Sequence, residues 1–215
     1  MNLQDALGPY RELMETADLA FEDFSASHPD LVRCVRGCDD CCHAVFGLFL
    51  VEAASIHIEF QGLEESLKRE TIERCKAADR AAARLESELR ACRHEPDRAE
   101  KLLAVERIPC PLLTGSRDCA LYGARPLTCR IYGIPTVVRG ALKACPKSGF
   151  SEKGRFGAFN LDMAQKQLLD LSTGMIEDIE EADPGKASLL VSVSKALMSP
   201  VHEIIEENYL KDAWS

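Results

Sequence analysis

The 215-residue sequence lacks an excess of positive charge and has no long apolar run. It holds 26 Lys and Arg against 35 Asp and Glu, for a formal net charge of -9. A protein that binds duplex DNA or RNA normally presents a basic face to the phosphates, so we expect no nucleic-acid partner. The longest apolar run, 44–51, falls far short of the roughly 20 residues that cross a bilayer. We therefore expect no membrane partner.

We also expect no secretory leader, because residues 1–5 show neither a basic start nor an apolar segment. We therefore expect a cytoplasmic protein. In that reducing compartment ten cysteines indicate metal or redox chemistry rather than disulfides. The sequence shows no Ser–His–Asp set, phosphate-binding glycine loop or paired-carboxylate signature at a persuasive spacing. The question of enzyme activity therefore depends on the cysteines.

The length and the hydrophobic periodicity predict one mainly α-helical domain, 1–215. Apolar residues recur at spacings of three and four along 3–24, and similar patterns predict helices at 49–60, 63–91 and 97–105. Asn160 is a candidate N-cap for a helix over 161–171 that extends towards 179. Asp183-Pro184 and Ser199-Pro200 predict the starts of two more helices, through 189–197 and 201–210. The C-terminal helices then occupy 160–211.

The middle of the chain has a different composition, with four cysteines, five prolines and five glycines in the 43 residues of 108–150. We expect loops there, and one small β-hairpin around 135–142. A segment with so few apolar anchors needs another source of stability, which bound metal can supply. The predicted fold is therefore a set of helices around an irregular, cysteine-rich, metal-organised centre.

Eight of the cysteines form two groups within a metal-binding region, 34–145, that a helical insert, 63–105, divides. The candidate ligands are Cys34, Cys38, Cys41 and Cys42 in the first group and Cys110, Cys119, Cys129 and Cys145 in the second. Thiolates are soft ligands that suit zinc or iron–sulfur clusters. Eight of them could form two tetrahedral zinc sites. A four-iron (4Fe-4S) cluster also takes four cysteines, often including a remote one followed by proline.

Two features of the cysteine pattern favour an iron–sulfur cluster over zinc. Cys110-Pro111 and Cys145-Pro146 both supply the cysteine–proline pair. The adjacent side chains of Cys41 and Cys42 diverge, so they fit two iron atoms of a cluster, or two separate ions, better than one ion; the alternative is that one of them is a reactive thiol. Zinc remains the alternative. The spacing of 34–41 also matches radical SAM enzymes, but Asp40 stands where that family has an aromatic residue, and no barrel pattern is present.

Other residues near the cysteines have simpler interpretations. Cys75 and Cys92 lie on the apolar seam of the predicted helix 63–91 and its end, so we expect them in the core. His43 is expected to form hydrogen bonds rather than to bind metal, and Asp39 and Asp40 are expected to be solvated turn residues.

Two arginines flank Cys129 in the sequence. Arg125 and Arg130 could offset the negative charge of a bound cluster or donate hydrogen bonds to it. The alternative is that they are surface arginines held by a carboxylate such as Asp118.

The cysteine motifs resemble those of the CxxCxxCC family of zinc- or iron-chelating proteins (YkgJ-like cysteine cluster proteins). The matching segments are 37–42, 110–113, 119–130, with the string C-x-x-Y-x-x-R-P-x-x-C-R, and Cys145. The resemblance implies metal bound at the eight cysteines. This sequence departs from the family spacing in placing three residues between Cys34 and Cys38. A relative, the flagellin lysine-N-methylase, has a similar cysteine cluster, which by analogy suggests a protein substrate.

Three functions fit these observations. The first is an iron–sulfur protein with redox or protein-modifying activity. The second is a zinc-stabilised binding module, or scaffold, without catalysis. The third is a metal carrier or sequestering protein, which would need exchangeable thiolates.

Overall fold

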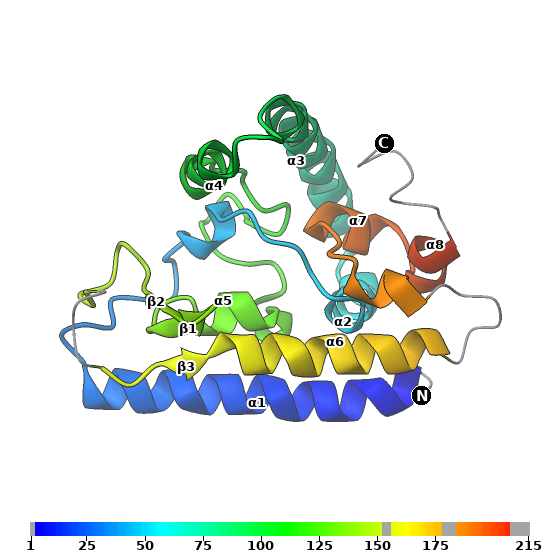
Figure 1. Cartoon of the computed structure of the whole chain (residues 1–215). Coiled ribbons are helices and arrows are strands. Elements are labelled where there is room, and N and C mark those ends of the chain that lie inside the picture. The colour runs from blue at the N-terminus through cyan, green and yellow to red at the C-terminus, as the bar shows by residue number, and fades with distance from the viewer. Residues whose placement is uncertain (1–2, 152–155, 178–183, 207–215) are drawn as a thin grey trace.

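The computed structural model describes residues 3–151, 156–177 and 184–206. Eight α-helices and a small three-stranded sheet lie in these ranges (Figure 1), so the prediction of a mainly α fold is confirmed. The helices are α1 Leu3–Ser27, α2 Leu50–Gln61, α3 Glu65–Ala91, α4 Pro96–Val105, α5 Leu127–Ile131, α6 Leu161–Glu177, α7 Val193–Met198 and α8 Val201–Glu206. None of the described helices is both long and apolar enough to cross a membrane.

Helices α1 and α6 lie side by side and run in opposite directions along one side of the molecule (Figure 1). The predicted periodicity explains this pairing, because Leu7, Tyr10 and Met14 recur on one face of α1 and are buried against α6 residues such as Leu168. The same core includes Leu127 and other residues of α5. Helices α1 and α6 therefore support α5, the short helix that carries Cys129.

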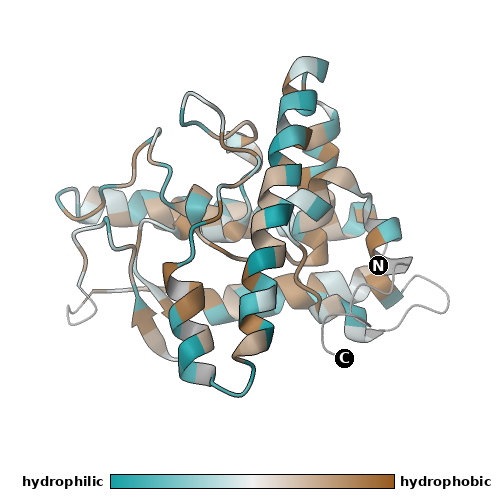
Figure 2. Cartoon of the chain, turned by 90° about the horizontal axis from the view of Figure 1, so that it is seen from above, coloured by the Kyte–Doolittle hydropathy of each residue, from teal (hydrophilic) through white to brown (hydrophobic). Residues whose placement is uncertain are grey.

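The residues of the predicted helical insert form α3 and α4, which stand on the opposite side of the molecule from α1 (Figure 1). Hydrophilic residues recur along α3 (Figure 2), and its buried residues are few: Thr71, Cys75, Ala78 and Leu85. Helix α3 packs against α7. Cys75 and Cys92 are both buried, at 0% and 2% exposure, as predicted for core residues.

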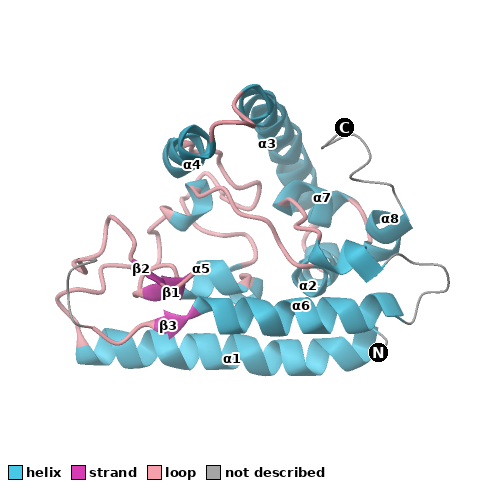
Figure 3. Ribbon diagram, viewed as in Figure 1, coloured by secondary structure: helices cyan, strands magenta, loops and turns pink. Residues whose placement is uncertain are grey.

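The segment between the two helical layers consists mostly of loops (Figure 3), as predicted for 108–150. The predicted hairpin is confirmed as β1 Thr136–Val138 and β2 Ala141–Lys143, and β3 Phe159–Asn160 pairs in parallel with β1. Arg139 and Gly140 both have positive φ, at 52° and 73°, which is the conformation of a two-residue type I′ turn. The Asp162 carboxylate accepts both of their backbone N–H groups and ties this turn to α6.

The C-terminal predictions need one correction. A 3₁₀ turn over Pro184–Ser188 is followed by extended residues, and α7 begins only at Val193, so the predicted helix through 189–197 is wrong in its first half. Ser192 caps α7, because its Oγ accepts the backbone N–H of Lys195 at 3.1 Å. Asn160 caps α6 through Met163, as predicted. Helix α8 is present to Glu206, and 207–210 and Asp183 lie outside the described residues.

The buried Glu52 side chain joins the starts of two helices. Its two oxygens accept the backbone N–H groups of Phe49, at 3.1 Å, and Leu127, at 3.0 Å. These residues lie at the N-termini of α2 and α5, where N–H groups lack partners within the helix. Burial raises the pKa of Glu52 to about 7, despite the two hydrogen bonds that lower it. Glu52 therefore fixes α5, with Cys129, relative to α2.

Glu52 should make the stability of the protein depend on pH. Its pKa is higher in the folded chain, about 7 against 4.5, so the folded state binds the proton more tightly and the free energy of unfolding falls as pH rises between these values. The loss is about 3 kcal/mol. Urea unfolding at pH 5 and pH 7.5 should show this slope in the wild type and a much weaker one in Glu52→Gln. If the free energies of unfolding of the wild type and Glu52→Gln differ by the same amount at pH 5 and at pH 7.5, the raised pKa of Glu52 is contradicted.

Candidate metal centre

The first cysteine group lies on a tightly turned loop between α1 and α2. The N–H of Cys38 donates to the carbonyl of Val35 at 2.9 Å, and Gly37, with φ of 87°, supplies the positive φ that this turn requires. A 3₁₀ turn over Cys41–His43 follows. Its hydrogen bonds run from Cys42 to Asp39 and from His43 to Asp40. Local turn chemistry thus sets the positions of Cys38, Cys41 and Cys42.

The backbone brings the second group to this loop from several directions. The N–H of Cys110 donates to the carbonyl of Cys42 at 2.7 Å, and Cys119 forms a β-bridge with Leu113. Gly133 lies against Cys34, and a Cβ at Gly133 would stand 2.4 Å from the Cβ of Cys34. Only glycine allows this approach. The insert of 63–105 therefore separates the two groups in sequence but not in space.

The eight candidate thiols line shared cavities that meet at Cys41. An apolar cavity of about 120 Å³ is bordered by Cys41, Cys42, Cys110, Cys119 and Cys129. A more polar cavity of about 450 Å³ is bordered by Cys34, Cys38 and Cys41. A third, small space adds Cys145 to these last three. The structure therefore divides the thiols into two sets, and Cys41 belongs to both.

The thiols of Cys41, Cys42 and Cys129 interact closely. Interaction with Cys129 and Cys42, and then the charge of Arg125, lowers the pKa of Cys41 below its ordinary value. The pKa values of Cys42 and Cys129 are raised, first by their interaction with Cys41 and then by burial. Burial also raises the pKa of Cys110 to about 12. Since a metal ligand must be a thiolate, loading this centre releases protons and is favoured by higher pH.

Arg125 lies beside the thiols, and Arg130 supports it. The guanidinium of Arg125 stacks 3.8 Å above the ring of Tyr122, and its charge lowers the pKa of Cys41. Arg130 donates to the carbonyl of Arg125 at 2.7 Å and forms an ion pair with Asp18. Both arginines line the cavity of about 450 Å³. Asp118, proposed above as their possible partner, is held instead by Arg36 at 2.6 Å.

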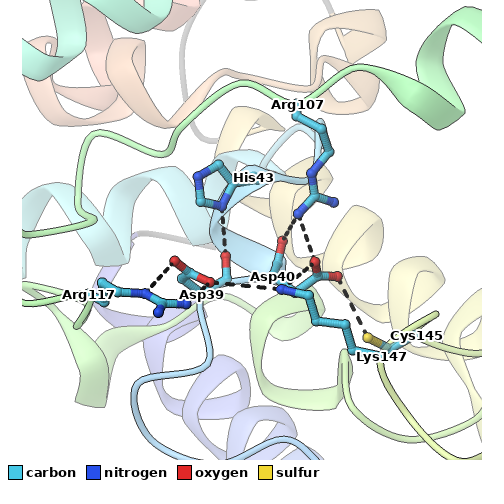
Figure 4. Close-up of polar contacts among 7 residues, drawn as sticks. All are labelled: Asp39, Asp40, His43, Arg107, Arg117, Cys145 and Lys147. Atoms are coloured by element: carbon cyan, nitrogen blue, oxygen red, sulfur yellow. Dashed lines mark hydrogen bonds and ion pairs between the residues drawn. The ribbon is translucent and has the colours of Figure 1, made fainter.

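The prediction that Asp39 and Asp40 are solvated turn residues is wrong. Asp40 is only 4% exposed and accepts from Arg107 at 2.8 Å and Lys147 at 3.1 Å (Figure 4). Asp39 forms a two-pronged pair with Arg117, at 3.0 Å for each bond, which lowers the pKa of Asp39 to about 2. The sequence did contain a signal for these ion pairs. Arg107, Arg117 and Lys147 each lie within three positions of a cysteine of the second group.

His43 forms a hydrogen bond, as predicted. Its ring Nδ1 lies 2.9 Å from the carbonyl oxygen of Asp39 (Figure 4). All ten cysteines are in the described residues and are free thiols. Across 3–151, 156–177 and 184–206, no three His, Cys, Asp or Glu side chains are already gathered as a group that could hold a metal ion. The donor chemistry fits soft metals, because the shared cavities are bordered by thiols of both groups.

One comparison with known proteins found a match. The model of the CxxCxxCC family, described as "Putative zinc- or iron-chelating domain", matches residues 33–146. This range begins one residue before Cys34 and ends one residue after Cys145, so it contains all eight candidate ligands. No curated protein and no solved structure was found to match the chain.

Proposed function

The chain belongs to the CxxCxxCC family of zinc- or iron-chelating domains, and from this premise we propose that its eight cysteines bind metal as iron–sulfur clusters of the four-iron type. The observation that carries the proposal is the meeting of the two cysteine groups at Cys41. That thiol borders the same apolar cavity as Cys129 of the second group and the same small space as Cys145. Thiols 88 and 104 residues apart in sequence thus lie around one centre.

The cavities support a division of the ligands into two sets of four. Cys42, Cys110, Cys119 and Cys129 border the apolar cavity, and Cys34, Cys38 and Cys145 border the small space on the other side of Cys41. Because neighbouring side chains diverge, we assign Cys42 to the first set and Cys41 to the second. Four thiolates are the usual ligand set of a four-iron cluster and of a structural zinc ion.

An iron–sulfur cluster, when bound, supplies one-electron redox chemistry. The residues of the chain would hold and tune it: Arg125 brings a positive charge next to Cys41, and Tyr122 and Arg130 hold Arg125 in place. The cavity of about 450 Å³ beside Cys41 has the size of a small-molecule or side-chain pocket. The proposed activity is redox chemistry or modification of a protein substrate. The cavity has room for a substrate side chain beside Cys41. We place this activity in the cytoplasm.

A second candidate, a zinc-stabilised module without catalysis, is favoured by the partly buried, apolar surroundings of the first set. Burial is the largest contribution to the raised pKa of Cys110 and of Cys119. Structural zinc sites are closed in this way, with four protein ligands and no exchangeable position. In that case the metal would only hold the loops of 108–150 together.

Anaerobic purification followed by elemental analysis distinguishes the two candidates. We expect a brown protein that absorbs near about 400 nm and contains iron and acid-labile sulfide in equal amounts. A colourless protein with stoichiometric zinc would support the zinc module instead. Protein that contains neither metal, even after reconstitution with iron and sulfide or with zinc, would contradict metal binding itself. Anaerobic handling is needed because zinc can replace a cluster that oxygen has destroyed.

A further inference from the structure

We propose that Asp40 is a positioning residue that holds the two cysteine groups together, an inference that rests on the proposed metal binding. Its Oδ1 accepts from Arg107 at 2.8 Å and from Lys147 at 3.1 Å, and its Oδ2 accepts the thiol of Cys145 at 3.7 Å. Arg107 also donates to the backbone carbonyl of Asp40 at 3.0 Å. Figure 4 shows these side chains converging on Asp40 from separate segments.

The partners of Asp40 and Asp39 lie next to candidate metal ligands. Arg107 is three residues before Cys110, and Lys147 is two residues after Cys145. Arg117, which pairs with Asp39, is two residues before Cys119, and Lys147 also lies 4.0 Å from Asp39. The loop that carries Cys38 and Cys41 is therefore connected by ion pairs to three of the four segments that carry the second group.

These ion pairs offset part of the entropic cost of bringing distant segments of the chain together. Asp40 is separated from Arg107 by 67 residues and from Cys145 by 105. Closing loops of this length costs conformational entropy. Residues that hold the ligands near their bound positions before metal arrives reduce the part of this cost that metal binding must meet.

Burial separates the two aspartates in importance. The side chain of Asp40 is 6% exposed and its partners Arg107 and Lys147 are 42% and 56% exposed, whereas Asp39 is 14% exposed and its partner Arg117 is 67% exposed. Exposed ion pairs contribute little, but removing one partner of a buried pair leaves the other charges without a counterion. Asp40 also contacts the candidate ligand Cys145 directly, whereas Figure 4 draws no contact between Asp39 and Cys145. Asp39 is therefore a matched control, adjacent in sequence and equal in chemistry.

The test compares Asp40→Asn and Asp39→Asn in the full chain, loaded with zinc or Co²⁺ after reduction. We expect Asp40→Asn to transfer metal to a competing chelator about 10- to 100-fold more readily than the wild type, and Asp39→Asn to remain within about threefold. The absorption bands of thiolate-bound Co²⁺ should shift or weaken in Asp40→Asn only. The melting temperature of each metal-free variant shows how much of the effect is a general loss of stability.

Two outcomes would overturn the proposal while leaving metal binding intact. One is wild-type metal retention in Asp40→Asn, and the other is an equal loss in both variants. A wild type that binds no metal would instead refute the proposed function. If Asp40→Asn does not fold, Lys147→Gln replaces it, because Lys147 is 56% exposed. That variant should lose metal faster than the wild type, and Lys147→Arg should restore retention. Equal retention in Lys147→Gln and the wild type would overturn the proposal.

Discussion

Serine in place of Cys41 should remove metal from both sets of thiols. Cys41 borders all three cavities described above and lies beside Cys129 and Cys42 on the apolar one, so its loss removes one ligand of its own set and a thiol that borders the other set. We expect Cys41→Ser to retain less than about a tenth of the wild-type metal, because the hydroxyl of serine is a much poorer ligand than a thiolate. Elemental analysis of the purified variant measures this.

Two further serine variants make the Cys41 experiment specific. Cys92→Ser is the matched control, since Cys92 is buried at the end of α3 and its thiol donates only to the carbonyl of Leu89. It should keep all of its metal. Cys34→Ser should lose metal from its own set and keep the metal of Cys42, Cys110, Cys119 and Cys129. Equal metal contents in Cys34→Ser and Cys41→Ser would show that all the thiols form a single site.

Removal of the metal should loosen the middle of the chain much more than its outer helices. Ligands present at about 1,000 times their dissociation constant stabilise the folded state by about 4 kcal/mol, which corresponds to about 10 °C in melting temperature for a chain of this size. Hydrogen exchange should rise across 108–150 after chelation. It should change little in α1 and α6, which contribute most of the buried residues of one apolar core.

The Cys41→Ser variant controls the chelation experiment, because a protein that holds no metal should not respond to the chelator. An increase in exchange spread evenly over the whole chain would mean that the metal stabilises the fold globally. No change at all in 108–150 would mean that the ion pairs of Asp39 and Asp40 and the apolar contacts of Leu112 and Ile131 are sufficient without metal.

Most of the helices could be predicted from the sequence because their signals are local. The periodic apolar residues of α1, the insert of α3 and α4, and the Asn160 cap all depend on neighbours within a few positions. The hairpin of β1 and β2 was predictable for the same reason. The start of α7 was not, because Ser192 rather than the Asp-Pro pair supplies its cap, and extended residues 189–191 are fixed by the bridge between Leu48 and Val191.

The cysteine pattern by itself determined the kind of chemistry and the family, since eight thiols at these spacings suit few other purposes. Only the tertiary structure decided which thiols face one another, that Cys41 lies between the two sets, and that Asp40 and Glu52 are buried. The physical reason is the range of the contacts. Asp40 meets Lys147, and Glu52 meets Leu127, across long stretches of chain. A single sequence contains no record of which distant charges pair, whereas the spacing of nearby side chains can be read from it directly.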